Sequence, residues 1–311
     1  MLIINFLDPA LAFYLVNTRM KLSMPELPEV ESVRLQLLGK IVGKKITEVK
    51  VLHPKSTNHH PDFASLLVGK KIAHIDRVGK LMIFSFTKEP DFFLLGHLKM
   101  TGQFFFIQRK NIVGGGHSMT DADSKNLPNK HTRISLHFSN GASLFFNDMR
   151  LFGYLKIATA GEVATARGRF GEEPIRDDFD FDSFTKKLKR RNTSIKAALL
   201  DQSFVAGLGN IYVDEALFAA KIRPDRKASS LTAAEAKAVI RAGGKIMLHS
   251  IEVGGTTFQN FADTNGHAGN FTKHLKVFGK QGTLCLRCKK ANIQKMRVAG
   301  RGTHFCPNCQ K

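Results

Sequence analysis

Apolar and polar positions divide the chain into regions of different periodicity. Between about residues 46 and 157, apolar residues form short runs rich in Val, Ile and Phe, separated by Gly, Asn and Asp. This pattern predicts β-strands packed as a sandwich or barrel. The polar stretch 111–129 is predicted to be a long loop between two of them. The expected strands are Ile46–Leu52, Ile72–Val78, Leu81–Phe86, Phe92–His97, Gln103–Gln108, Arg133–Phe138, Ser143–Phe146 and Gly153–Ile157.

Helical periodicity dominates on both sides of this region. One helix is expected from about Pro28 to Gly39, because proline suits a first turn and glycine suits a helix end. Its core face would carry Val30, Val33, Leu37, Leu38 and Ile41. In the second half of the chain, Thr232 and Glu235 form a capping box for the last of four helices. Those helices are expected at Phe181–Arg190, Ser194–Asp201, Ile211–Ala220 and Leu231–Ile251.

Together these patterns predict a multidomain α+β protein. We expect a β-sandwich domain at 24–160, a linker at 161–180 that is rich in glycine and acidic residues, a helical domain at 181–280 and a small unit at 281–311. Residues 1–23 are apolar, but they contain Asp8 and Pro9 and lack both a basic start and a cleavage site, so they make a poor signal peptide. We expect them to be a leader ahead of a true start at Met24, absent from the mature protein.

Charge narrows the class of partner. The chain has 47 basic and 26 acidic residues, a formal charge of +21, which favours a polyanion and most simply nucleic acid. The excess is uneven, since residues 264–311 hold ten basic residues and no acidic ones. The sequence contains no run of about 18 uncharged apolar residues, so it predicts no membrane span. We therefore expect no membrane partner.

The four cysteines all lie in this basic C-terminal stretch. Cys285 and Cys288 form one Cys-x-x-Cys pair, and Cys306 and Cys309 form a second one 17 residues later. This spacing predicts one structural Zn²⁺ per chain, held by four thiolates that leave no open coordination position. Disulfides or idle thiols are the competing interpretation. The nearby cations expected to be available for phosphate contacts are Arg287, Lys289, Lys290, Lys295, Arg297 and Arg301.

The segment Val205–Glu215 carries a second signal. Gly207 and Gly209 permit a tight turn, and Asn210 then stands at the start of a helix, where free backbone amides bind anions. Ordinary helix–helix packing explains the same residues equally well, so the segment alone does not decide between them.

The segment Asp148–Gly153 carries a third signal. If its backbone is extended, Arg150 and Phe152 project from the same face. An Arg and a Phe projecting together suit base-edge hydrogen bonding and stacking in nucleic acid. A core position for Phe152 is the alternative.

These motifs occur together in one known family. The start Met24–Glu31, which reads MPELPEVE, resembles the N-terminus of bacterial formamidopyrimidine-DNA glycosylases, and the other motifs follow in that family's order across residues 24–311. The resemblance implies a β-sandwich, a helix–two-turn–helix domain with a lid loop, and a zinc finger. It also implies that a monomer binds damaged double-stranded DNA, excises 8-oxoguanine and formamidopyrimidines, and cleaves the strand by β,δ-elimination.

The resemblance also implies the catalytic residues. In the family the initiator Met is removed, so Pro25 is expected to be the N-terminal nucleophile that forms a Schiff base with the damaged nucleotide. Glu26 matches the general acid/base, Glu29 a supporting carboxylate, and Lys80 a lysine near the lesion.

A second implied set of residues contacts DNA. His97 matches a phosphate contact, and Met100 fills the space that the flipped base leaves. Phe152 is expected to join Met100, while Arg150 contacts the opposite cytosine. The family's phosphate clamps correspond to Asn210 and Arg301, with Lys196 as a helper.

Three departures from the family pattern affect these expectations. A retained leader would bind the Pro25 nitrogen in an amide, which has no nucleophilic lone pair. Phe278 stands where the family has Tyr, and Gln259 stands where a basic lid residue is common. The alternatives are an endonuclease VIII-like enzyme for oxidised pyrimidines, or a non-catalytic zinc-ribbon DNA-binding protein if the leader is retained. For the enzyme, we expect a cytoplasmic, nucleoid-associated location in a bacterium.

Overall fold

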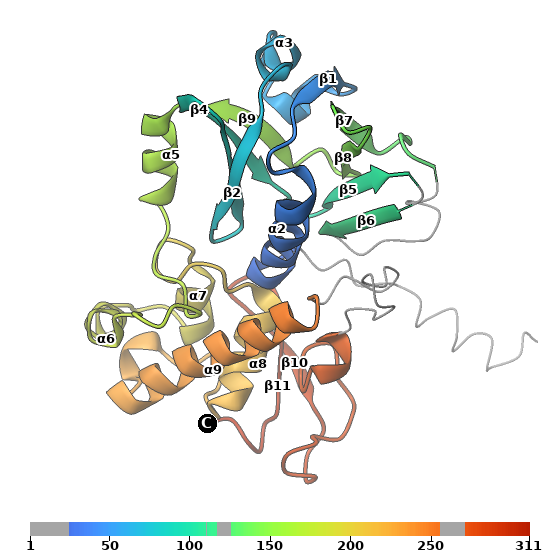
Figure 1. Cartoon of the computed structure of the whole chain (residues 1–311). Coiled ribbons are helices and arrows are strands. Elements are labelled where there is room, and N and C mark those ends of the chain that lie inside the picture. The colour runs from blue at the N-terminus through green and yellow to red at the C-terminus, as the bar shows by residue number, and fades with distance from the viewer. Residues whose placement is uncertain (1–24, 110, 117–125, 256–270) are drawn as a thin grey trace, which may run out of the picture.

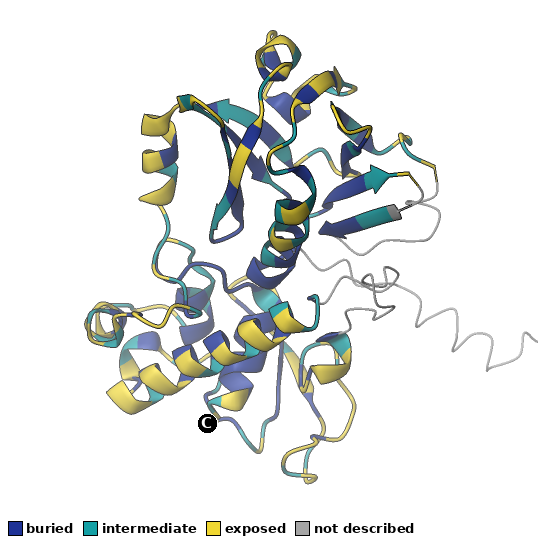
Figure 2. Cartoon of the chain, in the orientation of Figure 1, coloured by how far each residue is buried: buried dark blue, intermediate teal, exposed yellow. Residues whose placement is uncertain are grey.

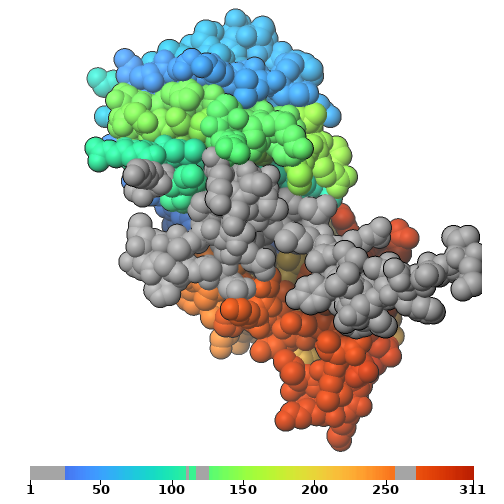
Figure 3. Space-filling model, turned by 90° about the vertical axis from the view of Figure 1, so that its right-hand side faces the viewer, coloured from blue at the N-terminus to red at the C-terminus, as the bar shows by residue number. Residues whose placement is uncertain are grey.

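The computed structural model describes residues 25–109, 111–116, 126–255 and 271–311. A β-sandwich lies at one end of the molecule, and a helical domain with the C-terminal hairpin lies at the other (Figure 1). Viewed from the side, the sandwich and the hairpin unit form opposite ends of the particle (Figure 3). Among the described residues, no helix is both long and apolar enough to cross a membrane.

The sandwich consists of two antiparallel sheets. The larger sheet has the strand order β1-β7-β8-β5-β6, and the smaller one has the order β2-β3-β4-β9. The larger sheet contains β1 (Ile46–Val51), β5 (Gly102–Gln108), β6 (Asn111–Gly116), β7 (Thr132–Phe138) and β8 (Ser143–Asp148). The smaller one contains β2 (Ile72–Val78), β3 (Leu81–Phe86), β4 (Glu89–His97) and β9 (Tyr154–Ala158).

The sheets enclose a core in which aromatic rings contact one another. The ring of Phe104 lies 6.3 Å from that of Phe84 in the facing sheet and 5.3 Å from that of Phe146. Every predicted strand is present, with bounds shifted by a few residues at most. The predicted loop at 111–129 was wrong at its start, because β6 pairs with β5 over Asn111–Gly116. The three glycines of β6 form this backbone pairing without the apolar side-chain pattern that identifies a strand in the sequence.

Helix α2 (Leu27–Ile41) packs on the sandwich through its predicted face. It extends two residues past Gly39, because nothing at this glycine breaks the helical backbone and the chain leaves the helix only at Val42. A 3-10 turn, η1 (Pro54–Thr57), and the short helix α3 (Phe63–Leu67) follow β1. The segment 161–180, predicted as a linker, begins inside a helix, α5 (Ala160–Arg167), which is capped by Thr159 and packs beside β4.

The helical domain has a core of its own. It is built from α6 (Phe181–Lys189), α7 (Ile195–Leu200), α8 (Asn210–Ala219) and α9 (Ala233–Glu252), joined by the 3-10 turn η2 (Ala228–Ser230). The capping box of Thr232 and Glu235 is confirmed. Helix α8 is buried along most of its length between α9 and the C-terminal hairpin (Figures 1 and 2).

The C-terminal unit follows the 3-10 turn η3 (Phe271–His274) and contains one hairpin, β10 (Gln294–Val298) and β11 (Arg301–Phe305). The hairpin turns at Ala299 and Gly300, both of which have positive φ. A carboxylate of α8, that of Glu215, accepts the backbone N–H groups of Lys276, Val277 and Phe278 at 2.8–3.1 Å. This contact fixes the entry into the C-terminal unit against the helical domain.

Candidate active site and nucleic-acid interface

The turn before α8 lies directly against the start of α2. A Cβ atom at Gly209 would stand 2.2 Å from the carboxyl carbon of Glu26, and one at Gly207 would stand 2.2 Å from the Leu27 side chain. Gly207 also has a φ of +91°, which other residues rarely adopt. The two glycines are therefore needed for the close approach of two helix starts that are about 180 residues apart in the sequence.

The carboxylate of Glu26 occupies the N-terminus of α8. It accepts hydrogen bonds from the backbone N–H groups of Ile211 at 2.9 Å and Tyr212 at 3.4 Å. From the sequence, these amides were expected to bind an external anion. In the structure, the Glu26 carboxylate occupies that place. The helix begins at Asn210 as expected, although its N-cap is Gly209 and no side chain caps it.

Burial gives Glu26 an unusual protonation equilibrium. Desolvation raises the pKa of its carboxyl group from 4.5 to about 7, against the opposing effects of the Lys80 charge and the two amides. Such a group exchanges a proton readily near neutral pH. The site therefore holds a carboxyl group suited to acid/base chemistry.

A second carboxylate holds the backbone of the first. Glu29 accepts the N–H of Glu26 at 2.9 Å and the hydroxyl of Tyr212 at 2.7 Å. The Tyr212 hydroxyl also bonds Ser250 of α9 at 2.7 Å. Pro25, Glu26 and Glu29 are all buried, so the start of α2 is held by α8 and α9 together.

Lys80 approaches the same place from the sandwich. It lies in the turn between β2 and β3, and its Nζ is 3.4 Å from the carbonyl oxygen of Leu208. Burial lowers the pKa of this amine, while Glu26 and Glu29 oppose the shift. The structure thus brings together Pro25, Glu26, Glu29 and Lys80, the four residues that the family resemblance implies as catalytic.

A half-buried ion-pair network fixes the strand end that leads to Lys80. Arg77 contacts Glu31 of α2 at 2.7 Å and Glu173 at 2.6 Å, and Glu173 also accepts the N–H of Gly79 at 2.6 Å. The sequence gave no sign of this network, because its members are spread over about 140 residues. Only their proximity in the fold distinguishes them from ordinary surface charges.

His97 and Met100 flank the turn after β4. Both are half-buried. The Nδ1 atom of His97 accepts the N–H of Lys99 at 3.0 Å, and burial together with the nearby cations Lys99 and Lys80 lowers its pKa to about 3. His97 is therefore neutral at physiological pH. A phosphate contact by this residue would use a neutral N–H donor.

Arg150 and Phe152 lie at the exposed tip of a bend. The expectation of an extended segment was wrong, because Leu151 has a left-handed φ of 57° and the segment is not a strand. The Arg150 guanidinium instead covers the Phe152 ring, 4.8 Å from its centroid. Phe152 remains 47% exposed, which excludes the core alternative.

Buried Asp148 holds this bend. Its carboxylate accepts the hydroxyl of Thr101, the N–H of Arg150 at 3.2 Å and the N–H of Gly153 at 2.6 Å. Without this carboxylate, its three donors would lose their hydrogen-bond partner at a buried position, which is costly. The exposed tip therefore stands on a rigid base.

The predicted phosphate clamps meet at the β10–β11 hairpin. Asn210 donates its side-chain N–H to the carbonyl of Gly302 at 3.1 Å, next to exposed Arg301. Lys196 does not reach the surface. It is 0% exposed and forms an ion pair of 2.6 Å with Asp214, so in this structure it cannot touch DNA. Its Nζ instead contacts the Gly302 carbonyl of the hairpin at 3.5 Å.

Asp214 and Glu215 are the residues that sequence reasoning missed here. Asp214 accepts the N–H of His304 in β11 at 2.8 Å as well as the Lys196 ammonium, and Glu215 holds the chain at 276–278. Two adjacent carboxylates on a helix with almost no exposed residues would have been the available signal. Phe278, the departure from Tyr, packs its ring 5.0 Å from that of His304, while Gln259 lies outside the described residues.

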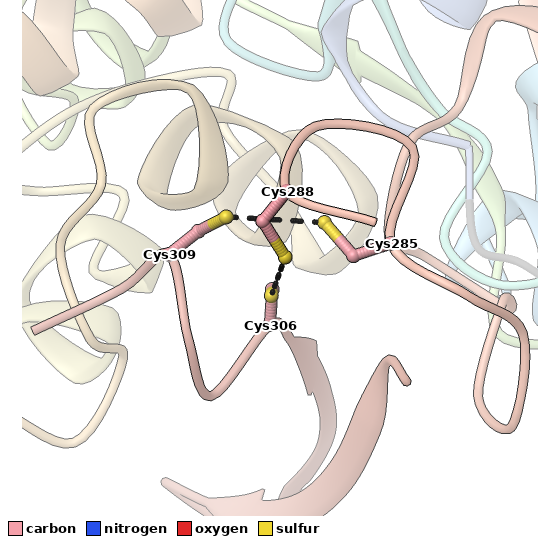
Figure 4. A group of neighbouring side chains, drawn as sticks. All are labelled: Cys285, Cys288, Cys306 and Cys309. Carbon is pink, nitrogen blue, oxygen red and sulfur yellow. Dashed lines mark hydrogen bonds between the residues drawn. The ribbon is translucent and has the colours of Figure 1, made fainter. Parts of the chain in front are cut away.

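The four cysteines converge into one group (Figure 4). Their sulfur atoms all lie within 4.8 Å of one another, with Cys285–Cys309 at 3.9 Å and Cys288–Cys306 at 3.7 Å, and none forms a disulfide. A tetrahedral zinc with Zn–S bonds of about 2.3 Å requires sulfur atoms about 3.8 Å apart. The four thiols thus fit Zn²⁺.

Arg287, which was expected to be available for phosphate, has another role. Its guanidinium donates to the carbonyl of Phe218 at 2.6 Å and lies 4.0 Å from the Phe218 ring centroid, at the C-terminal end of α8. A cation at this end of a helix is favourable. Arg287 therefore joins the first cysteine pair to the helical domain.

Comparisons with known proteins agree with this arrangement. Residues 24–155 match the formamidopyrimidine-DNA glycosylase N-terminal domain, 170–262 its H2TH domain, and 282–311 a zinc finger found in FPG and IleRS. A formamidopyrimidine-DNA glycosylase of Listeria monocytogenes is 39% identical, over 93% of this chain and 100% of its own length. One from Ligilactobacillus salivarius is 40% identical over 92% and 99%.

Solved structures show the same fold. A variant of the Lactococcus lactis enzyme in complex with Fapy-dG-containing DNA superposes with a TM-score of 0.80, at 35% identity over 92% of this chain and 100% of that one. MutM in complex with DNA that contains carbocyclic 8-oxo-G superposes with a TM-score of 0.79, at 36% identity over the same shares. The expected zinc finger and the expected sandwich and helical domains are confirmed. The chain belongs to the formamidopyrimidine-DNA glycosylase family.

Proposed function

We propose that this protein is a bifunctional DNA glycosylase and abasic-site lyase that binds damaged duplex DNA and removes 8-oxoguanine and formamidopyrimidine bases. The relatives are named formamidopyrimidine-DNA glycosylases, and solved relatives are in complex with DNA that contains Fapy-dG, carbocyclic 8-oxo-G or an abasic site. One observation in this chain carries the proposal. The residue after Pro25 is a buried carboxyl group with a pKa of about 7, beside a buried amine.

The chemistry begins at the Pro25 nitrogen. As a free N-terminus, this secondary amine carries a lone pair that attacks C1′ of the damaged nucleotide. The bond from C1′ to the base breaks, and the base leaves with the electron pair and takes up a proton. Glu26 in its acid form protonates O4′ as the sugar ring opens, which leaves an iminium between the proline nitrogen and C1′.

The iminium makes strand cleavage possible. It acidifies the proton on C2′, and loss of that proton expels the 3′ phosphate. A second elimination expels the 5′ phosphate, and water then hydrolyses the imine and frees Pro25. The Lys80 ammonium, beside Glu26 and Glu29, balances negative charge near the reacting sugar, and Glu29 holds the backbone that carries the nucleophile.

DNA binding is assigned to exposed and half-buried groups around this site. Phe152 and Met100 fill the space left by the flipped base, Arg150 contacts the orphan partner, and His97 contacts a phosphate. Asn210 and Arg301 hold the phosphates on the finger side. Zn²⁺ on the four cysteines keeps the hairpin in shape, and no step of the reaction involves it.

Pro25 can act only when its nitrogen is free, so the mature enzyme would start at this residue. Its place of action would be the cytoplasm, at the nucleoid of a bacterium, because that is where the chromosomal substrate lies. A retained leader would turn the same fold into a DNA-binding protein without lyase chemistry. The intact mass of the native protein distinguishes the two cases.

Covalent trapping tests the proposal. Protein begun at Met24, with Pro25 confirmed as its first residue, is incubated with an 8-oxoguanine·C duplex and borohydride, which reduces an iminium to a stable amine. We expect one protein–DNA adduct per active molecule. Protein that retains residues 1–24 is the matched control and should give none. Absence of an adduct with confirmed N-terminal Pro25 would refute the mechanism.

A further inference from the structure

The turn η1 presents one exposed cation on a rigid support. His53 enters it in an extended conformation, Pro54 occupies its first turn, and Asn58 leaves it with a left-handed φ of 52°. Ser56 and Thr57 are buried, and η1 packs against β9 and β7. Lys55 is exposed between these fixed neighbours.

The Lys55 side chain extends over Phe152. Its Nζ lies 5.9 Å from the centroid of the Phe152 ring, while the Arg150 guanidinium lies 4.8 Å from the same centroid. The exposed tip around Phe152 therefore carries two cations, which come from segments almost 100 residues apart. No sequence motif joins them, so only the fold shows that Lys55 belongs to this tip.

Within the described part of the chain, none of the ion pairs includes Lys55 or Arg150. The carboxylate closest in sequence to Arg150, that of Asp148, is buried and already bonded to the Thr101 hydroxyl and to the N–H groups of Arg150 and Gly153. A tip that carries these two cations is suited to binding a strongly anionic surface.

The chemistry of the two cations divides their targets. A guanidinium presents a planar fork that matches base edges, whereas a lysine ammonium is a compact charge on a flexible stem that suits a phosphate. Arg150 is already assigned to the orphan base. Lys55, farther from the ring and mounted on the flanking turn, would lie outside the base stack.

We propose that Lys55 binds a backbone phosphate of the duplex beside the vacated stack, and so anchors the strand into which Phe152 is inserted. This inference rests on the proposed function, because it takes Phe152 to be the group that fills the space of the flipped base. It adds a DNA contact from η1 to those expected from the sequence.

The test is the salt dependence of binding to a duplex that carries a tetrahydrofuran abasic analogue. Each phosphate contact contributes about 0.9 to the slope of log affinity against log salt. Lys55→Ala should reduce the slope by about 0.9, which weakens binding about eightfold at 0.1 M salt and has little effect near 1 M. Lys55→Arg should restore most of the slope, since it retains the charge.

Lys50 provides the matched control. It is an exposed lysine of β1, and it pairs with Glu48 at 3.0 Å. Lys50→Ala removes the same charge from the same domain, yet it should leave the slope unchanged. Equal slopes for the Lys55 and Lys50 variants would overturn the proposal.

Two other outcomes also overturn it. If Lys55→Ala changes the preference for the opposite base but not the slope, Lys55 contacts a base instead of a phosphate. If it lowers the melting temperature and leaves the slope intact, Lys55 only supports η1. Trapping by the unmodified enzyme is measured in parallel, so failure of the glycosylase assignment is seen independently of the Lys55 result.

Discussion

The pocket around Glu26 and the tip around Phe152 handle charge in opposite ways. In the pocket, two carboxyl groups and an amine are buried, and desolvation raises the pKa of Glu26 and lowers that of Lys80. At the tip, two cations and an apolar ring are exposed on a base held by Asp148. The difference suggests that chemistry needs a group whose proton affinity is set by the protein, whereas recognition needs groups that water leaves available. Changes in the pocket should therefore depend on pH, and changes at the tip should depend on salt.

The largest effect is expected from Glu26→Gln. Loss of a positioned general acid typically costs 10²–10⁴-fold in rate, so single-turnover excision should fall by about that factor. The normal enzyme should also lose activity as pH rises through about 7, where Glu26 loses its proton, and the variant should lose this limb of the profile. A pH–rate profile that stays the same in the variant would remove Glu26 from the acid role.

Gly209→Ala should damage the same pocket from the other helix. A Cβ there would stand 2.2–2.5 Å from the Glu26 carboxyl atoms, so that carboxyl group must leave the α8 amides. We expect a rate loss of about tenfold or more, and an altered upper pH limb. Gly39→Ala is the control, since nothing lies within 4 Å of its Cβ position in α2 and alanine favours a helix there by about 0.5–1 kcal/mol. Similar behaviour of the two variants would contradict the packing argument.

Removing the metal should affect binding more than the pocket. A chelator, or Cys285→Ser, should release the zinc-dependent hairpin and weaken binding to abasic-analogue duplex by about tenfold or more, because Arg301 loses its support. The measurement is duplex affinity alongside zinc content by metal analysis. Active, tightly binding protein without zinc would show that the hairpin holds its shape through Asp214 and Glu215 alone.

Phe152→Ala tests the tip. Loss of a stacking ring typically costs about 1–3 kcal/mol, so affinity for abasic-analogue duplex should fall by about 5- to 150-fold. The fall should be the same at pH 6 and pH 8, because the phenylalanine ring that is removed carries no titratable proton. A loss of affinity that depends on pH would show that the tip and the pocket are coupled.

Glu26 should also affect stability, and the sign of this effect is opposite to that on activity. The folded pKa of Glu26 lies above its ordinary 4.5, so its contribution to the free energy of unfolding is full below pH 4.5 and is lost as pH rises to about 7. The loss amounts to about 3 kcal/mol. Glu26→Gln should therefore be more stable than the normal enzyme at pH 8, with the difference shrinking at pH 5. Thermal melting at both values checks it.

The sequence predicted what depends on local pattern. Strands β2 and β3 matched because short apolar runs between turn residues indicate them, and the cysteine spacing indicated the zinc site. It could not predict β6, whose glycines carry no apolar signal but satisfy the open edge of β5.

The site divides in the same way. Pro25 and Glu26 were found by a motif, whereas the burial of Lys196 follows from Asp214, which lies one helix away. Arg77, Glu173 and Lys55 gain their meaning only from partners far along the chain. Distant pairing of this kind leaves no pattern within a window of sequence.

Helix α2 belongs to two cores at once. Its later turns, with Val33 and Leu37, are buried in the sandwich, while Leu27 at its start is buried in the helical domain. A helix of 15 residues spans about 22 Å, so α2 connects the two domains as a rigid element, with Glu26 at the end that enters the helical domain. A rotation of the sandwich away from the helical domain would carry α2 with it and pull that carboxyl group off the α8 amides. The pKa of the catalytic acid therefore depends on the contact between the two domains, because the burial and the backbone amides that set it come from the helical domain.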